Sequence, residues 1–202
     1  MKSREVPLAR SKSLKKSKGS KSEKSRGRSI LIFAAIILVI IIGAAYLVSQ
    51  PPRGGGGIGD VAPDFTLPVV TSSGLADQTV TLSSLRGKVV VLEFMVSWCH
   101  VCQEMAPSLE YLSVNYRAQD VTFISVAGTL QGATAETTAD FIRQYGVSWT
   151  SVLDTDNSAF AAYKVEATPT FVVLDRSGKI LSRFQGAIAT DVLAQAIDLA
   201  LS

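Results

Sequence analysis

The sequence predicts an α/β domain with a mixed central sheet flanked by helices, preceded by an N-terminal transmembrane helix. Continuous apolar runs rich in β-branched residues alternate with segments of helical periodicity, as buried strands and covering helices do. A turn motif near the C-terminus predicts an antiparallel hairpin, and an uncharged apolar run lies near the N-terminus. With 202 residues, 47% hydrophobic and 18% charged, the chain is neither disordered, collagen-like nor a disulfide-rich mini-protein.

Residues 1–29 form a strongly basic segment. They hold 11 of the 20 lysine and arginine residues and two of the 17 acidic residues, which leaves this segment at +9 and the remainder at −6. A segment this polar cannot bury a core, so we expect a disordered cytoplasmic tail attracted to anionic lipid. Nucleic-acid binding by the tail is the alternative, whereas the acidic folded domain is not expected to bind nucleic acid.

Residues 30–48 are the predicted membrane anchor. These 19 residues carry no charge and, as a helix, would span roughly 28 Å, close to the thickness of a bilayer core. A cleaved signal peptide and a buried core helix are the alternatives. Because Arg53 is the only basic residue in 49–85, the positive-inside rule places the N-terminus in the cytoplasm and the remainder outside. The protein is thus expected to be a single-pass cell-membrane protein.

A linker and one domain are expected after the anchor. Residues 49–57 are rich in Pro and Gly and reach about 15 to 18 Å as a flexible chain. Residues 58–202 are sufficient for one domain with its own core. A turn at 175–178 joins the last two main strands, and a short hairpin at 69–70 and 79–82 extends one sheet edge. The other expected elements are strands at 89–95, 121–126, 170–174 and 179–185, and helices at 100–118, 135–145, 158–163 and 190–201.

Both cysteines lie in one C-x-x-C motif, Cys99 and Cys102, where the first buried strand meets a long helix. A redox pair, half of a zinc site, a structural bridge and coincidence are the four interpretations. The motif with His100 offers three poorly arranged ligands to a metal that needs four, and a bridge across two residues stabilises little. The redox pair is favoured, which makes this disulfide the redox group and requires no separate cofactor or metal.

The position of the motif predicts which cysteine attacks. Unpaired backbone N–H groups at the start of a helix favour an anion, so the pKa of Cys99 should be lowered. Cys102, one turn further along the helix, should be less exposed and should resolve the mixed disulfide.

Three segments of the chain, in this order, resemble one known family. Residues 58–67 resemble its entry motif, 82–98 its lead into the active site, and 167–180 its cis-proline strand and hairpin. The chain is similar to membrane-anchored members of the thioredoxin superfamily, in the branch of TlpA-like reductases and alkyl hydroperoxide reductase/thiol-specific antioxidant proteins (redoxins). This resemblance implies a thioredoxin-like fold over about 70% of the chain.

The resemblance also assigns site residues. Cys99 resembles the family's nucleophile, Cys102 its resolving thiol, and Trp98 the tryptophan that packs beside the active site. Pro169 resembles the cis-proline that faces the disulfide, where it would expose the backbone of Thr168 to an extended client segment. An ordinary proline at the start of a strand is the alternative for Pro169.

Glu93 is the acid that interrupts the first apolar strand, six positions before Cys99. Thioredoxins carry a buried acid at this place, and a buried carboxyl group would have a raised pKa suited to proton exchange with Cys102. The alternative is a side chain that points to an edge or to solvent.

The sequence departs from the family at two places near the motif. His100 and Val101 separate the cysteines, where thioredoxins have Gly-Pro, so this dipeptide is expected to tune the redox potential. His100 would stabilise the Cys99 thiolate when protonated, or would be a plain exposed residue. Several such reductases have Glu three residues after the second cysteine; here Met105 occupies that position, and Glu104 is expected to be a solvated helix residue.

The expected function is that of an extracytoplasmic thiol-disulfide oxidoreductase that reduces protein disulfides, for example in cytochrome c maturation. With no third cysteine, a membrane protein would supply electrons in trans. Disulfide oxidation or isomerisation is the alternative. A thiol peroxidase is disfavoured because Leu92 and Val96 occupy the Pro and Thr/Ser positions of its nucleophile loop. A copper-binding assembly factor and a non-enzymatic anchoring module are disfavoured as well.

Overall fold

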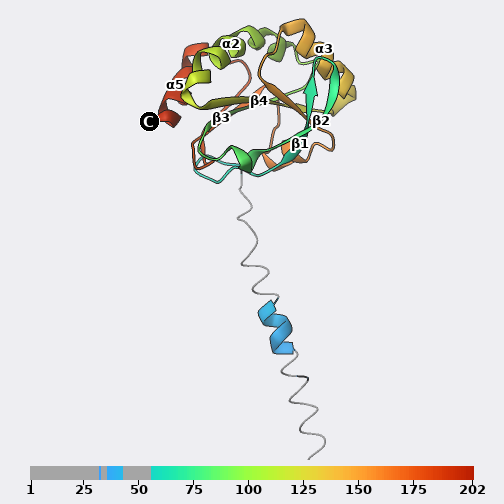
Figure 1. The fold of residues 1–202 in the computed structure, drawn as a ribbon, viewed down its shortest axis with the longest axis vertical. Helices are drawn as coiled ribbons and strands as arrows, with labels where there is room; N and C mark the ends of the chain where they lie inside the picture. The colour runs from blue at the N-terminus through green and yellow to red at the C-terminus, as the bar shows by residue number, and fades with distance from the viewer. Residues whose placement is uncertain (1–31, 33–35, 43–55) are drawn as a thin grey trace, which may run out of the picture. The chain divides into compact units, whose positions relative to one another are not determined.

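The computed structural model describes residues 32, 36–42 and 56–202, of which the last range forms an α/β domain (Figure 1). Its seven strands make one mixed sheet in the order β2-β1-β5-β4-β3-β6-β7. The central strands β3, β4 and β5 are parallel, and the remaining pairs are antiparallel. The strands are β1 Thr66–Thr71, β2 Gly74–Thr81, β3 Val89–Met95, β4 Val121–Gly128, β5 Thr150–Asp154, β6 Thr170–Leu174 and β7 Ile180–Gln185.

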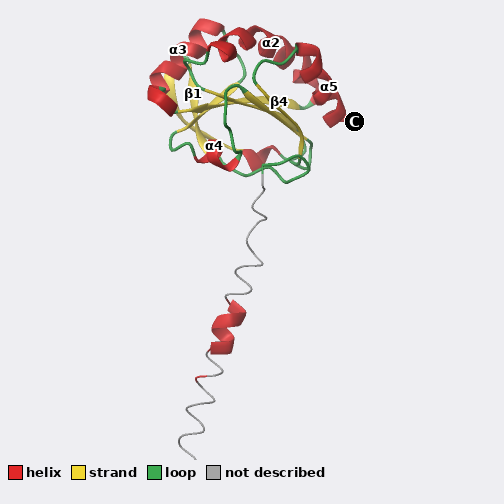
Figure 2. Ribbon diagram, turned by 180° about the vertical axis from the view of Figure 1, so that it is seen from behind, coloured by secondary structure: helices red, strands yellow, loops and turns green. Residues whose placement is uncertain are grey.

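Helices cover both faces of this sheet. Helices α2, α3 and α5 lie over one face and the short α4 over the other (Figures 1 and 2). The helices are α2 His100–Tyr116, α3 Ala135–Tyr145, α4 Ser158–Ala162 and α5 Thr190–Leu201, with 3-10 turns η1 Leu82–Leu85, η2 Arg117–Gln119 and η3 Leu130–Gly132. The thioredoxin-like arrangement expected from the sequence is therefore present.

The central strands are buried because both faces are covered. Every residue of β3 and β6 is buried, which explains why their sequences, apart from Glu93 and Thr170, are apolar instead of alternating. Alternate β3 residues serve different cores: Val89 and Val91 pack with α2 and α5, whereas Val90 and Leu92 belong to the core that includes α4. Glu93 follows the first of these two series, so its side chain lies on the α2 face.

Local signals in the sequence set the ends of two elements. Thr134 and Thr137 form a reciprocal capping box at the start of α3, and Gly146 ends this helix with a left-handed φ of 65°. In the hairpin turn, Asp175 Oδ1 accepts from the Lys179 N–H at 2.9 Å, and Gly178 takes a φ of 76°.

One strand was missing from the sequence prediction. β5 is a five-residue segment with Thr and Ser at its start, too short and polar to stand out from a loop. β5 is a strand because it pairs with β4 in parallel on one side and with β1 antiparallel on the other. Through β5, the N-terminal hairpin of β1 and β2 joins the sheet edge as predicted, although both strands are longer than expected.

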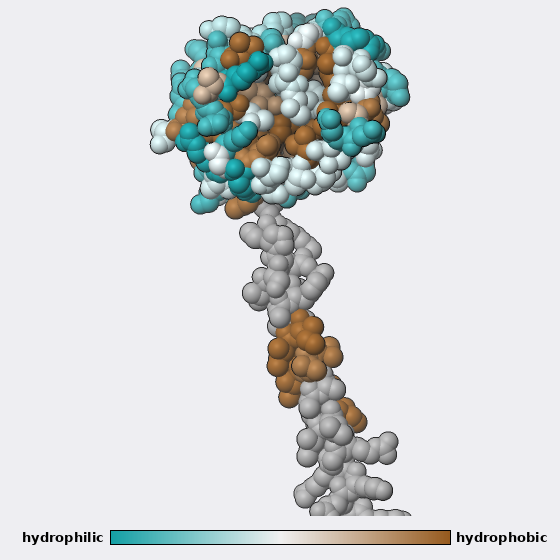
Figure 3. Space-filling model, viewed as in Figure 1, coloured by the Kyte–Doolittle hydropathy of each residue, from teal (hydrophilic) through white to brown (hydrophobic). Residues whose placement is uncertain are grey.

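The predicted anchor falls mostly outside the described residues. Residues 36–42 are helical, all apolar and all exposed (Figure 3). Among the described residues, no helix has both the length and the apolar character needed to cross a membrane. The predictions for 1–29, for the rest of 30–48 and for most of the linker lie outside the described ranges and remain predictions.

Candidate active site

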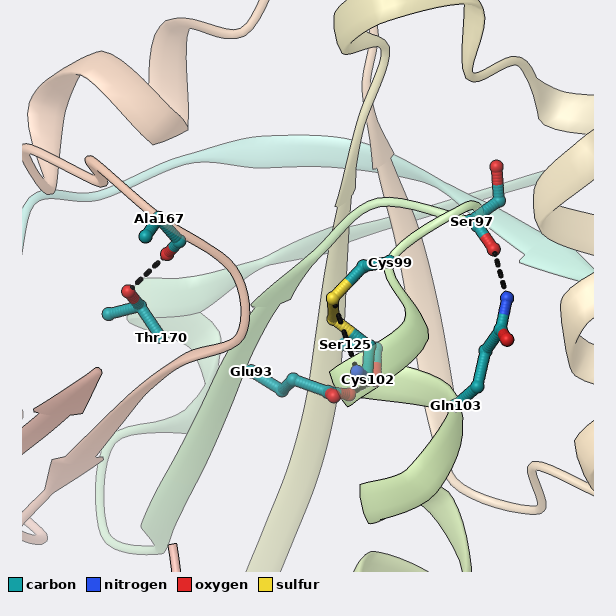
Figure 4. Close-up of a disulfide and its surroundings, with 8 residues drawn as sticks. All are labelled: Glu93, Ser97, Cys99, Cys102, Gln103, Ser125, Ala167 and Thr170. Carbon is teal, nitrogen blue, oxygen red and sulfur yellow. Dashed lines mark hydrogen bonds between the residues drawn. A yellow bond between two sulfur atoms is a disulfide. The ribbon is translucent and has the colours of Figure 1, made fainter. Parts of the chain in front are cut away.

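The two cysteines form a disulfide at the N-terminus of α2 (Figure 4). Cys99 is the N-cap residue, and its Sγ accepts a hydrogen bond from the Cys102 N–H at 3.1 Å. Cys99 keeps 5% of its surface exposed and Cys102 none. A sulfur that already accepts a helical N–H is well placed to bear negative charge, and only Cys99 is open to a partner. Both features agree with Cys99 as the attacking residue.

Glu93 is buried below this disulfide. The side chain is 3% exposed, which excludes the alternative in which it points to solvent. Burial raises the pKa of Glu93 to about 7, and a hydrogen bond from Ser125 opposes the increase. Figure 4 shows the carboxyl group directed toward the turn of α2 that carries Cys102. An acid with this pKa can exchange a proton with a thiol near neutral pH.

Two residues that the sequence analysis did not single out complete the surroundings of Glu93. Ser125 Oγ donates to Glu93 Oε2 at 2.5 Å and accepts from Trp149 Nε1 at 2.8 Å. Ser125 was a detectable signal, because it is a hydroxyl residue between apolar residues of a predicted buried strand. The parallel register that pairs Ser125 with Glu93 is a tertiary feature.

Pro169 has the predicted cis peptide bond with Thr168 at the start of β6. The loop before it is held by the Thr170 hydroxyl, which donates to the Ala167 carbonyl at 2.7 Å. This fixes the segment that includes Thr168, whose backbone is the expected docking edge for a client.

Trp98 lies next to Cys99 and is 49% exposed, and its Nε1 donates to the Leu130 carbonyl at 3.1 Å. Trp98 and η3 form one side of a pocket of about 170 Å³, and the loop before Pro169 forms another. The η3 residues in the lining are Leu130 and Gln131, which were not identified from the sequence. The remaining lining residues are Val96, Phe160, Val165, Glu166, Ala167 and Thr168.

The dipeptide between the cysteines divides between surface and core. His100 is exposed, and its Nδ1 lies 3.3 Å from Glu104 Oε1, a contact that becomes an ion pair when the imidazole is protonated. Val101 is half-buried and packs against both apolar cores. Glu104 is exposed, as expected for a solvated helix residue. Within the described part of the chain, no group of three or more His, Cys, Asp or Glu residues is arranged to hold a metal ion.

Comparisons with known proteins identify the family of the chain. The family model for Redoxin matches residues 58–197. The thiol-disulfide oxidoreductase ResA of Oceanobacillus iheyensis is 32% identical over 136 residues, which cover 67% of this chain and 69% of ResA. ResA of Bacillus subtilis is 28% identical over 141 residues, covering 70% of this chain and 74% of that protein.

Solved structures show the same fold. A protein of Chlorobium tepidum described as a thiol:disulfide interchange protein DsbE is 30% identical, with a TM-score of 0.65 over 72% of this chain and 99% of that one. A secreted disulfide oxidoreductase of Mycobacterium tuberculosis is 28% identical, with a TM-score of 0.57 over 67% of this chain and 95% of that one. The chain therefore belongs to the Redoxin family and is a thioredoxin-like thiol-disulfide oxidoreductase.

Proposed function

We propose that this protein is a membrane-anchored, extracytoplasmic reductant of protein disulfides. The observation that carries the proposal is the asymmetry of the disulfide, with Cys99 at a helix N-terminus keeping 5% of its surface exposed and Cys102 fully buried beside a buried acid. ResA and DsbE-like relatives support the class of reaction. Cytochrome c maturation is the process we propose for its clients.

The reaction consists of two thiol–disulfide exchanges. The Cys99 thiolate attacks one sulfur of the client disulfide, an S–S bond forms between them, and the other client sulfur leaves as a thiolate. Cys102 then attacks Cys99 Sγ, gives its proton to the Glu93 carboxylate, and releases the first client sulfur with its electron pair. Two electrons have passed to the client, and the Cys99–Cys102 disulfide has re-formed.

The client would bind beside the disulfide. An extended client segment pairs with the backbone of Thr168 before Pro169, while the pocket between Trp98 and η3 accepts a neighbouring side chain. Trapping tests this arrangement: Cys102→Ser should accumulate a mixed disulfide between Cys99 and the client, and Cys99→Ser should not. Full turnover by Cys102→Ser without trapping would contradict the two-thiol mechanism.

A dithiol partner must reduce the protein again after each cycle, because the chain has only these two cysteines. We propose a membrane protein that relays electrons from the cytoplasm. The reduction potential of the full chain, equilibrated with glutathione and dithiothreitol buffers, tests the direction. A value near or below about −250 mV supports a reductant, whereas about −120 to −180 mV would assign disulfide oxidation or isomerisation.

The proposed location rests on residues 1–48. The uncharged run at 30–48, the exposed apolar residues 36–42 and the basic tail before them support an anchor with its N-terminus in the cytoplasm. Protease added to intact protoplasts should digest the domain of the full chain. Without protease, the full chain should stay in the membrane fraction during an alkaline carbonate wash. Protection from the protease, or release by alkaline carbonate, would contradict this topology.

A further inference from the structure

A chain of hydrogen bonds across three adjacent strands ends at Glu93. Trp149, which directly precedes β5, donates from Nε1 to Ser125 Oγ in β4 at 2.8 Å. Ser125 Oγ donates to Glu93 Oε2 in β3 at 2.5 Å. Ser125 and Glu93 are each only 3% exposed, so solvent does not compete for these bonds.

The chemistry of the three groups fixes the direction of the chain. An indole N–H can only donate, and a serine hydroxyl has a single hydrogen. Ser125 accepts from Trp149, and among the described residues Glu93 Oε2 is the one acceptor bonded to the Ser125 hydroxyl, so the single serine hydrogen is donated to Oε2. A proton bound to this acid then belongs on Oε1, which is buried and has no hydrogen-bond partner among the described residues.

The helix that carries the cysteines also holds the residue before Trp149, the first donor in this series of hydrogen bonds. Glu110 of α2 accepts from the Ser148 N–H at 3.2 Å and from the Ser148 hydroxyl at 2.7 Å. Ser148 precedes Trp149, whose ring packs against both apolar cores. The indole position is thus determined by α2, the core and the start of β5 together.

The groups that face Glu93 from the neighbouring elements are uncharged. Phe171 is its register partner in β6, Ser125 its partner in β4, and Cys102 lies on the side of α2. From α5, Leu193 and Ile197 contribute to the core on this face. Burial and the Ser125 hydrogen bond alone shift the pKa of Glu93, with no charged neighbour contributing.

We propose that Ser125 and Trp149 are positioning residues that keep the Glu93 proton on Oε1 and set the pH at which Oε1 accepts the proton of Cys102. This rests on the proposed two-step exchange. In its second step the Cys102 S–H bond breaks, the proton passes to Oε1, the Cys102–Cys99 bond forms, and the client thiolate leaves with its electron pair. Ser125 stabilises the charged carboxylate, and Trp149 keeps the Ser125 hydrogen pointed at Oε2.

The first test follows the carboxyl group itself, independently of activity. Titration of the oxidised full chain labelled with ¹³C at the glutamate carboxyls gives the Glu93 midpoint, with Glu93→Gln identifying its signal. Loss of a hydrogen bond to the charged form should raise this midpoint by about one pH unit in Ser125→Ala. Trp149→Phe keeps the ring, removes the N–H and should raise it less.

Two variants serve as controls. Ser125→Thr retains the hydroxyl and should restore the wild-type midpoint. Ser151→Ala removes the neighbouring buried hydroxyl, paired with Ser125 in the sheet but not bonded to Glu93, and should leave the midpoint unchanged. A Glu93 midpoint that does not move in Ser125→Ala, while this variant keeps its folded spectrum, would overturn the proposal.

The second test measures resolution of a preformed mixed disulfide between Cys99 and a peptide thiol as a function of pH. The rate should rise as Glu93 ionises, and its midpoint should move upward in Ser125→Ala by the same amount as the carboxyl titration. A rate profile that stays in place while the titration moves would overturn the link to Cys102. Failure of the proposed function is distinct, because it appears as full turnover without a trapped mixed disulfide in Cys102→Ser, whatever the Glu93 midpoint does.

Discussion

Single polar atoms among apolar neighbours carry most of the chemistry at the residue scale. Glu93 and Ser125 are rare polar side chains in buried strands, and they lie opposite each other in the register of β3 and β4. A buried carboxyl group costs free energy when charged, so Glu93 destabilises the folded domain at high pH while its raised pKa suits it to proton exchange.

His100 supports a prediction about the redox potential. A protonated imidazole next to Cys99 stabilises the thiolate and raises the potential, but at this exposed position the effect is screened by solvent. His100→Gln should therefore lower the potential by about 10 to 20 mV. Glu104→Gln should have the opposite effect, because it removes a negative charge from the first turns of the same helix. Identical potentials in all three proteins would make His100 a plain surface residue.

At the scale of elements, the N-terminus of α2 contains a residue with both a structural and a chemical role. The sulfur that attacks the client also caps the helix, because Cys99 Sγ accepts the Cys102 N–H. Serine can replace this acceptor and alanine cannot. In the reduced state, Cys99→Ala should be less stable to urea than Cys99→Ser by about 1 kcal/mol, although both variants lose exchange activity. Equal stabilities would show that the sulfur contributes nothing as a cap.

The short turn η3 supports a prediction about client binding. Leu130 is 40% exposed, lines the pocket beside Trp98 and has no part in the disulfide chemistry. If a client covers Leu130, Leu130→Ser should raise KM for a disulfide peptide about tenfold, as expected for loss of one apolar contact. The potential and the reaction with dithiothreitol should be unchanged. Leu75→Ser, exposed on β2, is the matched control; an equal KM for Leu130→Ser and wild type would place the client elsewhere.

Glu93 also makes the stability of the whole domain depend on pH. Its pKa is raised from 4.5 to about 7, so the folded protein holds this proton over a range where the unfolded chain has released it. Stability from this residue is complete below about pH 4.5 and is lost as pH rises through 7, a total of about 3 kcal/mol. Asp154, whose pKa burial also raises, adds to the same trend.

Urea unfolding of the oxidised protein between pH 4.5 and 8 measures this loss. Glu93→Gln should remove most of the decline, whereas Asp77→Asn, an exposed acid on β2, should keep it. A decline of equal size in Glu93→Gln would assign the pH dependence to other groups.

Local signals in the sequence were enough to predict the fold class, the boundaries of the strongest elements and the identity of the redox pair. β6 and α3 have the predicted bounds because their apolar patterns and flanking turn or cap residues are local properties. The position of the C-x-x-C motif between strand and helix was readable for the same reason. The predicted roles of Pro169 and Trp98 came from the resemblance; the structure gives Pro169 its cis peptide bond and places Trp98 and Thr168 on one pocket.

The strand β5, the pocket at η3 and the surroundings of Glu93 depend on tertiary contacts and could not be predicted from local sequence. β5 exists because two neighbouring strands pair with it, not because its five residues have a strong preference. Ser125 and Trp149 lie 32 and 56 residues after Glu93, and the register of three adjacent strands brings them together. Hydrogen bonds between residues so far apart in sequence leave no periodic signal, so only the assembled sheet shows which oxygen of Glu93 is free to exchange a proton.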